Sequence, residues 1–128
     1  MVYLDTSVAL AHLLAEDMAP PAVLWQRTLV ASRLIEYELW NRIHARGLGK
    51  SHGEMVRALL GQVTILELVT PVLARALEPF PVQVCTLDAI HLASADFLRT
   101  QGQTVTVATY DQRMREAAIA MGFLIESL

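Results

Sequence analysis

The feature that most constrains the fold is an alternation of short apolar runs with longer segments of helical spacing. The apolar runs are rich in aliphatic and β-branched side chains, and we predict that they are buried strands. They cover residues 2–4, 28–31, 63–69, 104–109 and 123–125. Strands that alternate with helices of ordinary length favour a parallel sheet with helices on both faces. The sequence therefore predicts an α/β fold.

The segments between these runs are predicted to be helices. They cover residues 8–16, 32–46, 51–60, 70–78, 86–101 and 111–121, with a short helix through Trp25 and Gln26. Ser51 and Glu54 have the spacing of a capping box, in which each side chain satisfies a free backbone N–H at a helix start. Thr70 and Pro71 have the pattern of a cap followed by proline at the first helical position.

Length and composition are those of one globular domain, expected to span residues 1–128. Hydrophobic residues make up 54% of the chain and charged residues 18%, which excludes disorder and indicates that a protein partner covers some apolar surface. Cys85 is the only cysteine, so no intrachain disulfide forms. Neither a signal peptide nor an apolar run of about 18 residues is present. We expect a soluble, cytoplasmic protein.

The net charge of -3 at pH 7 gives no overall basic footprint for nucleic acid, although a local patch can act within an acidic total. The only lysine is Lys50, and the other basic residues are arginines, whose guanidinium groups bind phosphate in a bidentate manner. The candidate phosphate contacts lie near acidic residues that are discussed next: Arg42, Arg46, Arg113 and Arg115. Ordinary surface charge is the alternative for each of them.

Two acidic residues directly follow predicted strands, where ligands bind in an open α/β sheet. Asp5 follows the first strand and Asp111 the fourth, and each also stands where a helix N-cap is expected. Asp88 lies in the first turn of a predicted helix, where the helix dipole favours an acid. Glu38 lies four residues before Arg42 and has the spacing of a helical ion pair.

Convergence of these four acids would require a cation. Two negative charges 4 Å apart repel by about 4 kcal/mol at an effective dielectric constant of 20. Oxygen ligands without a histidine or cysteine cluster indicate Mg²⁺ or Mn²⁺ rather than zinc. Spacing along the chain does not by itself prove that the acids converge.

The four acids stand in four short motifs that follow one another along the chain. The motifs are Leu4-Asp5-Thr6-Ser7-Val8, Ser32-x-Leu34-x-x-x-Glu38, Leu87 to Ala95, and Thr109-Tyr110-Asp111 with Ala117, Ala118 and Gly122 after it. Together they resemble the motifs of PIN-domain ribonucleases and, more closely, those of the VapC toxins of VapBC toxin–antitoxin modules. The resemblance implies a PIN-like, Rossmann-like α/β/α sandwich with a central parallel sheet.

The resemblance also implies roles for individual residues. The implied catalytic and metal-binding acids are Asp5, Glu38, Asp88 and Asp111, which hold Mg²⁺ or Mn²⁺. The implied supporting hydroxyl groups are those of Thr6, Ser7 and Thr109. Glu36 is the alternative to Glu38 as the second acid, but two residues apart on a helix the two side chains point in different directions. Asp111 contributes less consistently than the other acids across the family.

The implied activity is endonucleolytic hydrolysis of RNA through a carboxylate-held metal and an activated water, which makes the four arginines candidate RNA contacts. The implied partners are a VapB-like antitoxin helix and a second copy of the chain, bound through apolar residues of the first half. One alternative is a catalytically degenerate PIN module that binds RNA or a protein. Catalysis through a phosphorylated Asp5 is disfavoured because no lysine follows Lys50.

Other residues are expected to be structural. Asp96, two helical turns after Asp88, is predicted to be structural, and His91 is predicted to be a packed or hydrogen-bonded side chain rather than a metal ligand. The large aromatic side chains are predicted to lie in the core: Trp25, Tyr37 and Trp40.

Overall fold

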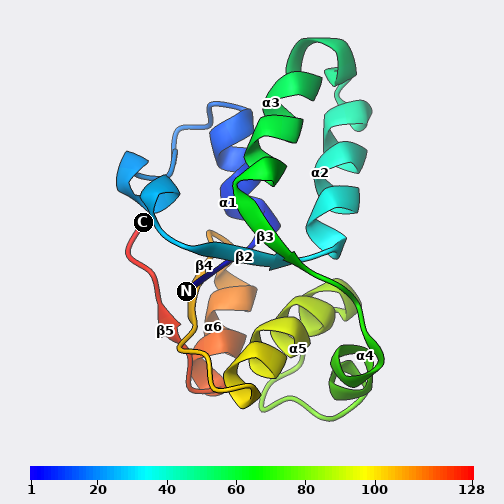
Figure 1. Ribbon diagram of the computed structural model, residues 1–128, viewed down its shortest axis with the longest axis vertical. Helices are drawn as coiled ribbons and strands as arrows, with labels where there is room; N and C mark the ends of the chain where they lie inside the picture. Colours follow the sequence, from blue (N-terminus) through cyan, green and yellow to red (C-terminus); the bar gives the residue numbers. More distant parts are fainter.

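The computed structural model describes residues 1–128 and has an α/β fold in three layers (Figure 1). Its single sheet has five strands in the order β3-β2-β1-β4-β5, and every neighbouring pair is parallel. The strands are β1 (Val2–Leu4), β2 (Leu29–Ser32), β3 (Val63–Leu66), β4 (Thr106–Ala108) and β5 (Leu124–Ile125). The predicted α/β fold with a central parallel sheet is therefore confirmed.

Six α-helices cover the two faces of the sheet. They are α1 (Thr6–Leu13), α2 (Leu34–Ala45), α3 (Gly49–Gly61), α4 (Thr70–Ala76), α5 (Thr86–Thr100) and α6 (Gln112–Ala120). In addition, Ala22–Gln26 forms the expected short helix, of the 3₁₀ type. Helices α1, α2 and α3 lie on one side of the sheet, and α4, α5 and α6 lie on the other (Figure 1). No helix has both the length and the apolar character that crossing a membrane requires.

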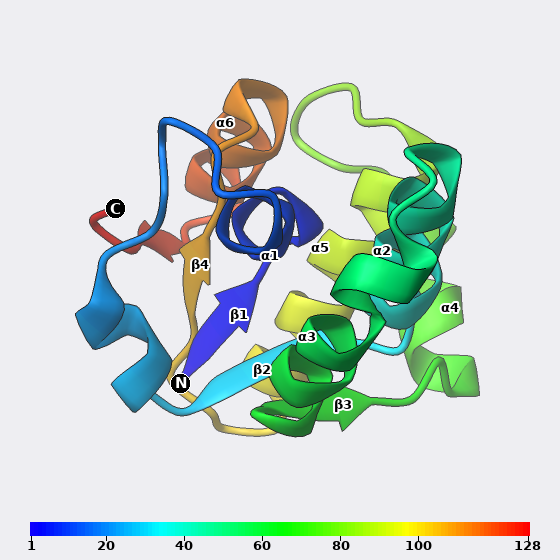
Figure 2. The same cartoon turned by 90° about the horizontal axis from the view of Figure 1, so that it is seen from above.

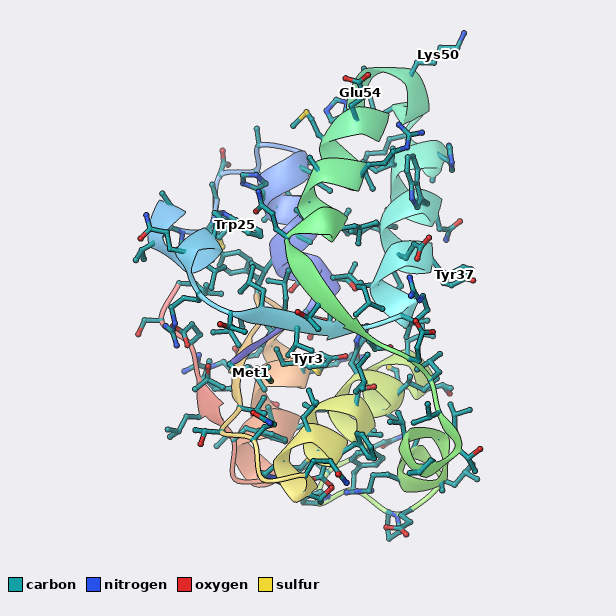
Figure 3. The ribbon with its side chains drawn as sticks, viewed as in Figure 1. Met1, Tyr3, Trp25, Tyr37, Lys50 and Glu54 are labelled. Carbon is teal, nitrogen blue, oxygen red and sulfur yellow. The ribbon has the colours of Figure 1, made fainter.

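Each face of the sheet carries its own hydrophobic core. Val2 and Leu4 of β1 belong to the cluster beneath α1, α2 and α3, whereas Tyr3 belongs to the cluster beneath α5 and α6. This alternation follows from the two-residue period of a β-strand, which points successive side chains to opposite faces. Tyr3 is thereby placed in the interior between the sheet and α5, a position that matters for the site (Figure 3).

Strand β1 lies in the middle of the sheet, with β2 and β3 added on one side of it and β4 and β5 on the other. From β1 the chain proceeds through α1 to β2 on one side, and from β4 it proceeds through α6 to β5 on the other. Figure 2 shows the carboxyl ends of β1 and β4 side by side, with α1 and α6 leaving toward opposite faces. Such a switch point leaves a crevice in which α/β proteins bind ligands.

Two predicted strands are shorter in the structure because neighbouring strands limit their pairing. The strand predicted over residues 63–69 ends at Leu66, which pairs with Ser32, the last residue of β2. The strand predicted over residues 104–109 is confined to Thr106–Ala108. Beyond Ala108 the chain has no partner on β1 and turns toward α6.

The predicted capping box is wrong. Helix α3 begins at Gly49, so Ser51 lies inside it and donates a hydrogen bond to the carbonyl oxygen of Leu48 at 3.3 Å. Gly47 adopts a φ of 68° and reverses the chain after α2, which lets α3 start at once without a capping side chain. Thr70 is likewise not the cap of α4 but its first residue, and Val69 holds the cap position.

Candidate active site

Four acidic side chains line one cavity at the carboxyl ends of β1 and β4. The cavity has a volume of about 370 Å³. Its acids are those expected from the sequence: Asp5, Glu38, Asp88 and Asp111. They come from the end of β1, from α2, from the first turn of α5 and from the residue before α6. The convergence that spacing left open is thus present in the fold.

Asp5 is held by one hydroxyl group from the first turn of α1 and one from the residue after β4. It is 6% exposed, and its Oδ2 accepts hydrogen bonds from Ser7 Oγ at 2.6 Å and Thr109 Oγ1 at 2.8 Å. Those hydroxyl oxygens in turn accept backbone N–H groups of Tyr110 and Asp111, each at 3.0 Å. Asp5 occupies the N-cap position of α1 without making a side-chain capping bond. Its carboxylate therefore lines the cavity and does not cap the helix.

Glu38 points inward and forms no ion pair with Arg42. Its Oε1 accepts hydrogen bonds from Thr6 Oγ1 at 2.8 Å and from His91 Nε2 at 2.5 Å. Burial opposes ionisation of this carboxyl, but the bonds from His91 and Thr6 lower its pKa below the usual value. Glu38 is therefore ionised and fixed in orientation.

Asp88 and Asp111 differ in how their charges are compensated. Burial and the charges of Asp111, Asp5 and Glu38 raise the pKa of Asp88. Asp111 caps α6, because its Oδ1 accepts the backbone N–H groups of Arg113 at 2.8 Å and Met114 at 3.2 Å. Asp111 thus combines a capping role with a place on the cavity, whereas the Asp88 side chain accepts no hydrogen bond from the protein and keeps a raised pKa.

The donor set of this cavity fits a hard divalent cation. Carboxylate oxygens are the ligands that Mg²⁺ and Mn²⁺ prefer. The raised pKa of Asp88 comes first from burial and then from the neighbouring negative charges, and a cation relieves both effects. No three acidic, histidine or cysteine side chains stand close enough to enclose an ion by themselves. Magnesium does not need such an enclosure, because it keeps several waters and is held by one or two carboxylates together with substrate phosphate.

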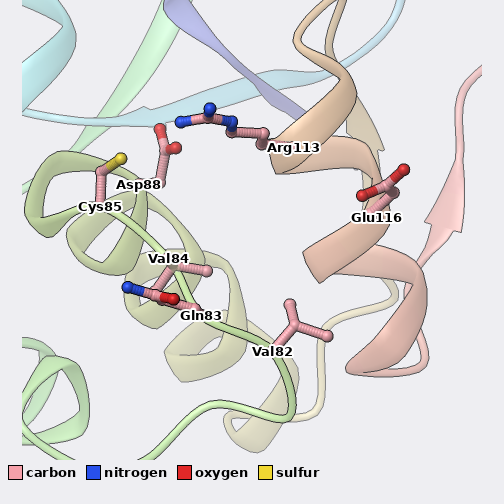
Figure 4. A pocket seen from close by; sticks show the side chains of 7 residues that line it. All are labelled: Val82, Gln83, Val84, Cys85, Asp88, Arg113 and Glu116. Carbon is pink, nitrogen blue, oxygen red and sulfur yellow. The ribbon is translucent and has the colours of Figure 1, made fainter.

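Two of the four candidate arginines line hollows that adjoin the acidic cavity. Arg113 and Asp88 line a hollow of about 510 Å³, and the Arg113 guanidinium points toward Asp88 across it (Figure 4). Arg42 lines both the acidic cavity and a neighbouring hollow of about 640 Å³. Arg115 lines a different hollow, near the C-terminus, and Arg46 lies on the exposed surface after α2.

Several expectations about structural residues are confirmed. Asp96 bonds Arg75 at 2.8 Å and Arg99 at 2.7 Å, so it stabilises packing within its own layer. His91 is 1% exposed and hydrogen-bonded, as expected.

The prediction that Tyr37 lies in the core is wrong, because its side chain is 67% exposed and projects from α2 (Figure 3). Trp25 and Trp40 pack against the margin of the core and are only partly buried. What the sequence missed is the contact between His91 and Glu38, for which no local spacing gives a signal.

Comparisons with known proteins agree with this geometry. The PIN domain family matches residues 2–120. Ribonuclease VapC47 of Mycobacterium tuberculosis is 31% identical over 134 residues, covering 99% of this chain and 96% of that protein. Ribonuclease VapC46 of the same species is 31% identical over 127 residues, covering 97% and 95%. A toxin–antitoxin complex from Klebsiella pneumoniae has the same fold, with a TM-score of 0.62, 15% identity and 94% of each chain covered.

Proposed function

The chain belongs to the PIN domain family, and on this premise we propose that it is a Mg²⁺- or Mn²⁺-dependent endoribonuclease, the toxin of a toxin–antitoxin pair. One observation carries the proposal: four carboxylates from four separate segments meet at the crevice between β1 and β4. The similarity to two VapC ribonucleases over nearly the whole chain supports the choice of RNA as substrate.

The residues that would hold the cation, directly or through its bound waters, are Asp5, Glu38, Asp88 and Asp111. A divalent cation bound there supplies positive charge beside the scissile phosphate and lowers the pKa of a water. Ser7 and Thr109 orient Asp5, and Thr6 orients Glu38. Asp88 is the acid whose pKa is raised, which suits its carboxylate to accept the proton of the attacking water.

The assay that tests this function is cleavage of RNA by the purified chain with Mn²⁺ and with EDTA. We expect cleavage with Mn²⁺ only. The alternative is a degenerate module that binds RNA or a protein without reacting. It would bind no Mn²⁺, and any trace cleavage would be unaffected by substitution of the carboxylates.

Arg42 and Arg113 are proposed to contact the RNA backbone on the two sides of the cleavage point. Neither arginine is in an ion pair, whereas Arg33 and Arg99 are paired with acids. An arginine that lines a cavity without a carboxylate partner is available for a phosphate, which its planar guanidinium binds through two hydrogen bonds.

Replacement of Arg113 with Gln is expected to weaken RNA binding and to make it less salt-dependent. Loss of one phosphate contact lowers the slope of log K against log salt by about 0.7 for single-stranded nucleic acid. The measurement is fluorescence anisotropy with labelled RNA at several salt concentrations, in an Asp5→Asn background that does not cleave. Lys50→Gln is the matched control, because Lys50 lies at the far tip of α3 (Figure 3). An equal change in slope for both variants would contradict the assignment.

We also propose an antitoxin and a second copy of the chain as protein partners. The sequence indicated apolar surface in the first half, whereas exposed apolar side chains occur in both halves of the structure. Leu73 of α4 and Leu77, which directly follows α4, line an apolar hollow of about 460 Å³ in the second half, and Leu77 is 89% exposed. Sedimentation velocity at tens of micromolar protein is expected to show a dimer. A monomer at that concentration would remove self-association from the proposal.

A further inference from the structure

A buried chain of hydrogen bonds ends at Glu38. The backbone N–H of Ser32 donates to Tyr3 Oη at 3.1 Å, and this hydroxyl bonds His91 Nδ1 at 2.8 Å. On the other side of the ring, His91 Nε2 lies 2.5 Å from Glu38 Oε1. Tyr3 is 0% exposed and His91 is 1% exposed, so water does not compete for these bonds. The chain thus connects β2, β1 and α5 to a carboxylate of the cavity.

The hydrogen atoms of these bonds are assigned from the groups at each end. Tyr3 Oη receives the N–H of Ser32 and lies 2.8 Å from His91 Nδ1, so its single hydrogen can be donated to Nδ1 of a neutral ring. In that arrangement Nδ1 is an acceptor, and the ring hydrogen lies on Nε2. From there it is donated to Glu38, whose carboxylate can only accept.

The two carboxylate oxygens of Glu38 have different surroundings. Oε1 accepts from both His91 and Thr6, at 2.5 and 2.8 Å. Oε2 has no hydrogen-bond partner in the protein, although Glu38 lines the cavity. Both ring nitrogens of His91 are occupied and the ring is closed off from the cavity, so His91 itself is excluded as a metal ligand.

We infer that His91 is a positioning residue, which Tyr3 holds in the Nε2–H tautomer and which turns Glu38 so that Oε2 is presented to the cation. The inference rests on the proposed function, since it assigns a role at the same site. Hydrogen-bond partners behind ligating carboxylates fix ligand orientation, and their loss weakens metal affinity or activity by about 10–100-fold.

The first test compares His91→Phe with His91→Gln. Phenylalanine keeps the ring shape without polar atoms, and we expect it to weaken Mn²⁺ binding and lower kcat by about 10–100-fold with little change in KM. Glutamine has an amide nitrogen that can donate to Glu38 and an oxygen that can accept from Tyr3. We expect His91→Gln to restore most of the Mn²⁺ binding and most of kcat. Leu92→Val is the matched control on α5, because Leu92 is 1% exposed but makes none of these bonds. It is expected to lower the melting temperature alone.

The second test reads the tautomer directly. Ring ¹⁵N shifts of His91 in metal-free protein are expected to show hydrogen on Nε2 and none on Nδ1. Tyr3→Phe is expected to give a mixture of tautomers and weaker Mn²⁺ binding. Hydrogen on Nδ1 in the unaltered chain would overturn the inference.

The outcomes separate this inference from the function on which it rests. If the unaltered chain cleaves RNA and His91→Phe binds Mn²⁺ equally well, positioning by His91 is excluded and the proposed function stands. If the unaltered chain neither binds Mn²⁺ nor cleaves RNA, both are overturned. A loss in His91→Phe that His91→Gln does not restore would assign His91 a packing role only.

Discussion

RNA cleavage is expected to fall by more than about 100-fold when Asp5 is replaced with Asn. Loss of a residue that only hydrogen-bonds to a metal ligand costs about 10–100-fold, and loss of the ligand's own charge is expected to cost more. Asp5 accepts hydrogen bonds from Ser7 and Thr109 and is 6% exposed. An amide oxygen accepts the same two bonds, so the substitution removes the charge and keeps the contacts. The measurement is kcat/KM on RNA at saturating Mn²⁺, with circular dichroism to confirm the fold.

The matched control for Asp5→Asn is Glu54→Gln. Glu54 is exposed near the far tip of α3, where loss of one negative charge does not affect the crevice (Figure 3). We expect unchanged cleavage in this variant. Full activity in Asp5→Asn would mean that the carboxylate cavity is not the reaction centre, whatever the RNA substrate.

Asp88→Asn is expected to abolish cleavage and to make the metal-free protein more stable. The pKa of Asp88 is raised in the folded state by burial and by three nearby carboxylates, so its ionised form opposes folding at neutral pH. The helix dipole of α5 favours Asp88 in the first turn, but the raised pKa shows that burial and repulsion outweigh it. Solvent screens this half-buried group, and we expect the melting temperature to rise by only about 2–5 °C.

Two conditions check the origin of this stability gain. Because a raised pKa means that the folded state binds the proton more tightly, the penalty disappears as the pH falls through that pKa. The difference between Asp88→Asn and the unaltered chain should therefore shrink at acidic pH. Mn²⁺ should stabilise the unaltered chain more than the variant, since only the folded state with Asp88 binds it fully. A variant that melts lower than the unaltered chain without metal would contradict this account.

The order and type of the elements were predictable because they depend on local pattern. Each strand is a short apolar run, and the α/β alternation restricts the sheet to parallel pairing. Element ends were less predictable because they depend on neighbours, as where Leu66 is the last residue of β3 with a partner on β2. The capping box failed because Gly47 sets where α3 begins, regardless of the Ser51 and Glu54 side chains.

The residues of the candidate site also differ in how far local sequence could predict them. Asp5 and Asp111 were found through their position after strands, which any parallel α/β sheet turns into a crevice. Glu38 was ambiguous, because a helical ion pair with Arg42 has equally good spacing and only the packing of α2 against α1 directs Glu38 inward. The contact between Tyr3 and His91 joins residues 88 positions apart and depends on both the face of β1 and the placement of α5.

The pairing of β1 with β4 also determines when the site comes into existence. Val2 pairs with Thr106, so the second edge of the central strand stays open until the chain has been made through β4, about 100 residues later. Thr109, which holds Asp5, and Asp111 follow directly after that late strand. A chain still being synthesised therefore has Asp5, Glu38 and Asp88 but no assembled crevice, because long-range pairing must come first. On the proposed function, the nuclease would stay inactive until β4 and Asp111 have been synthesised and β4 has paired with β1.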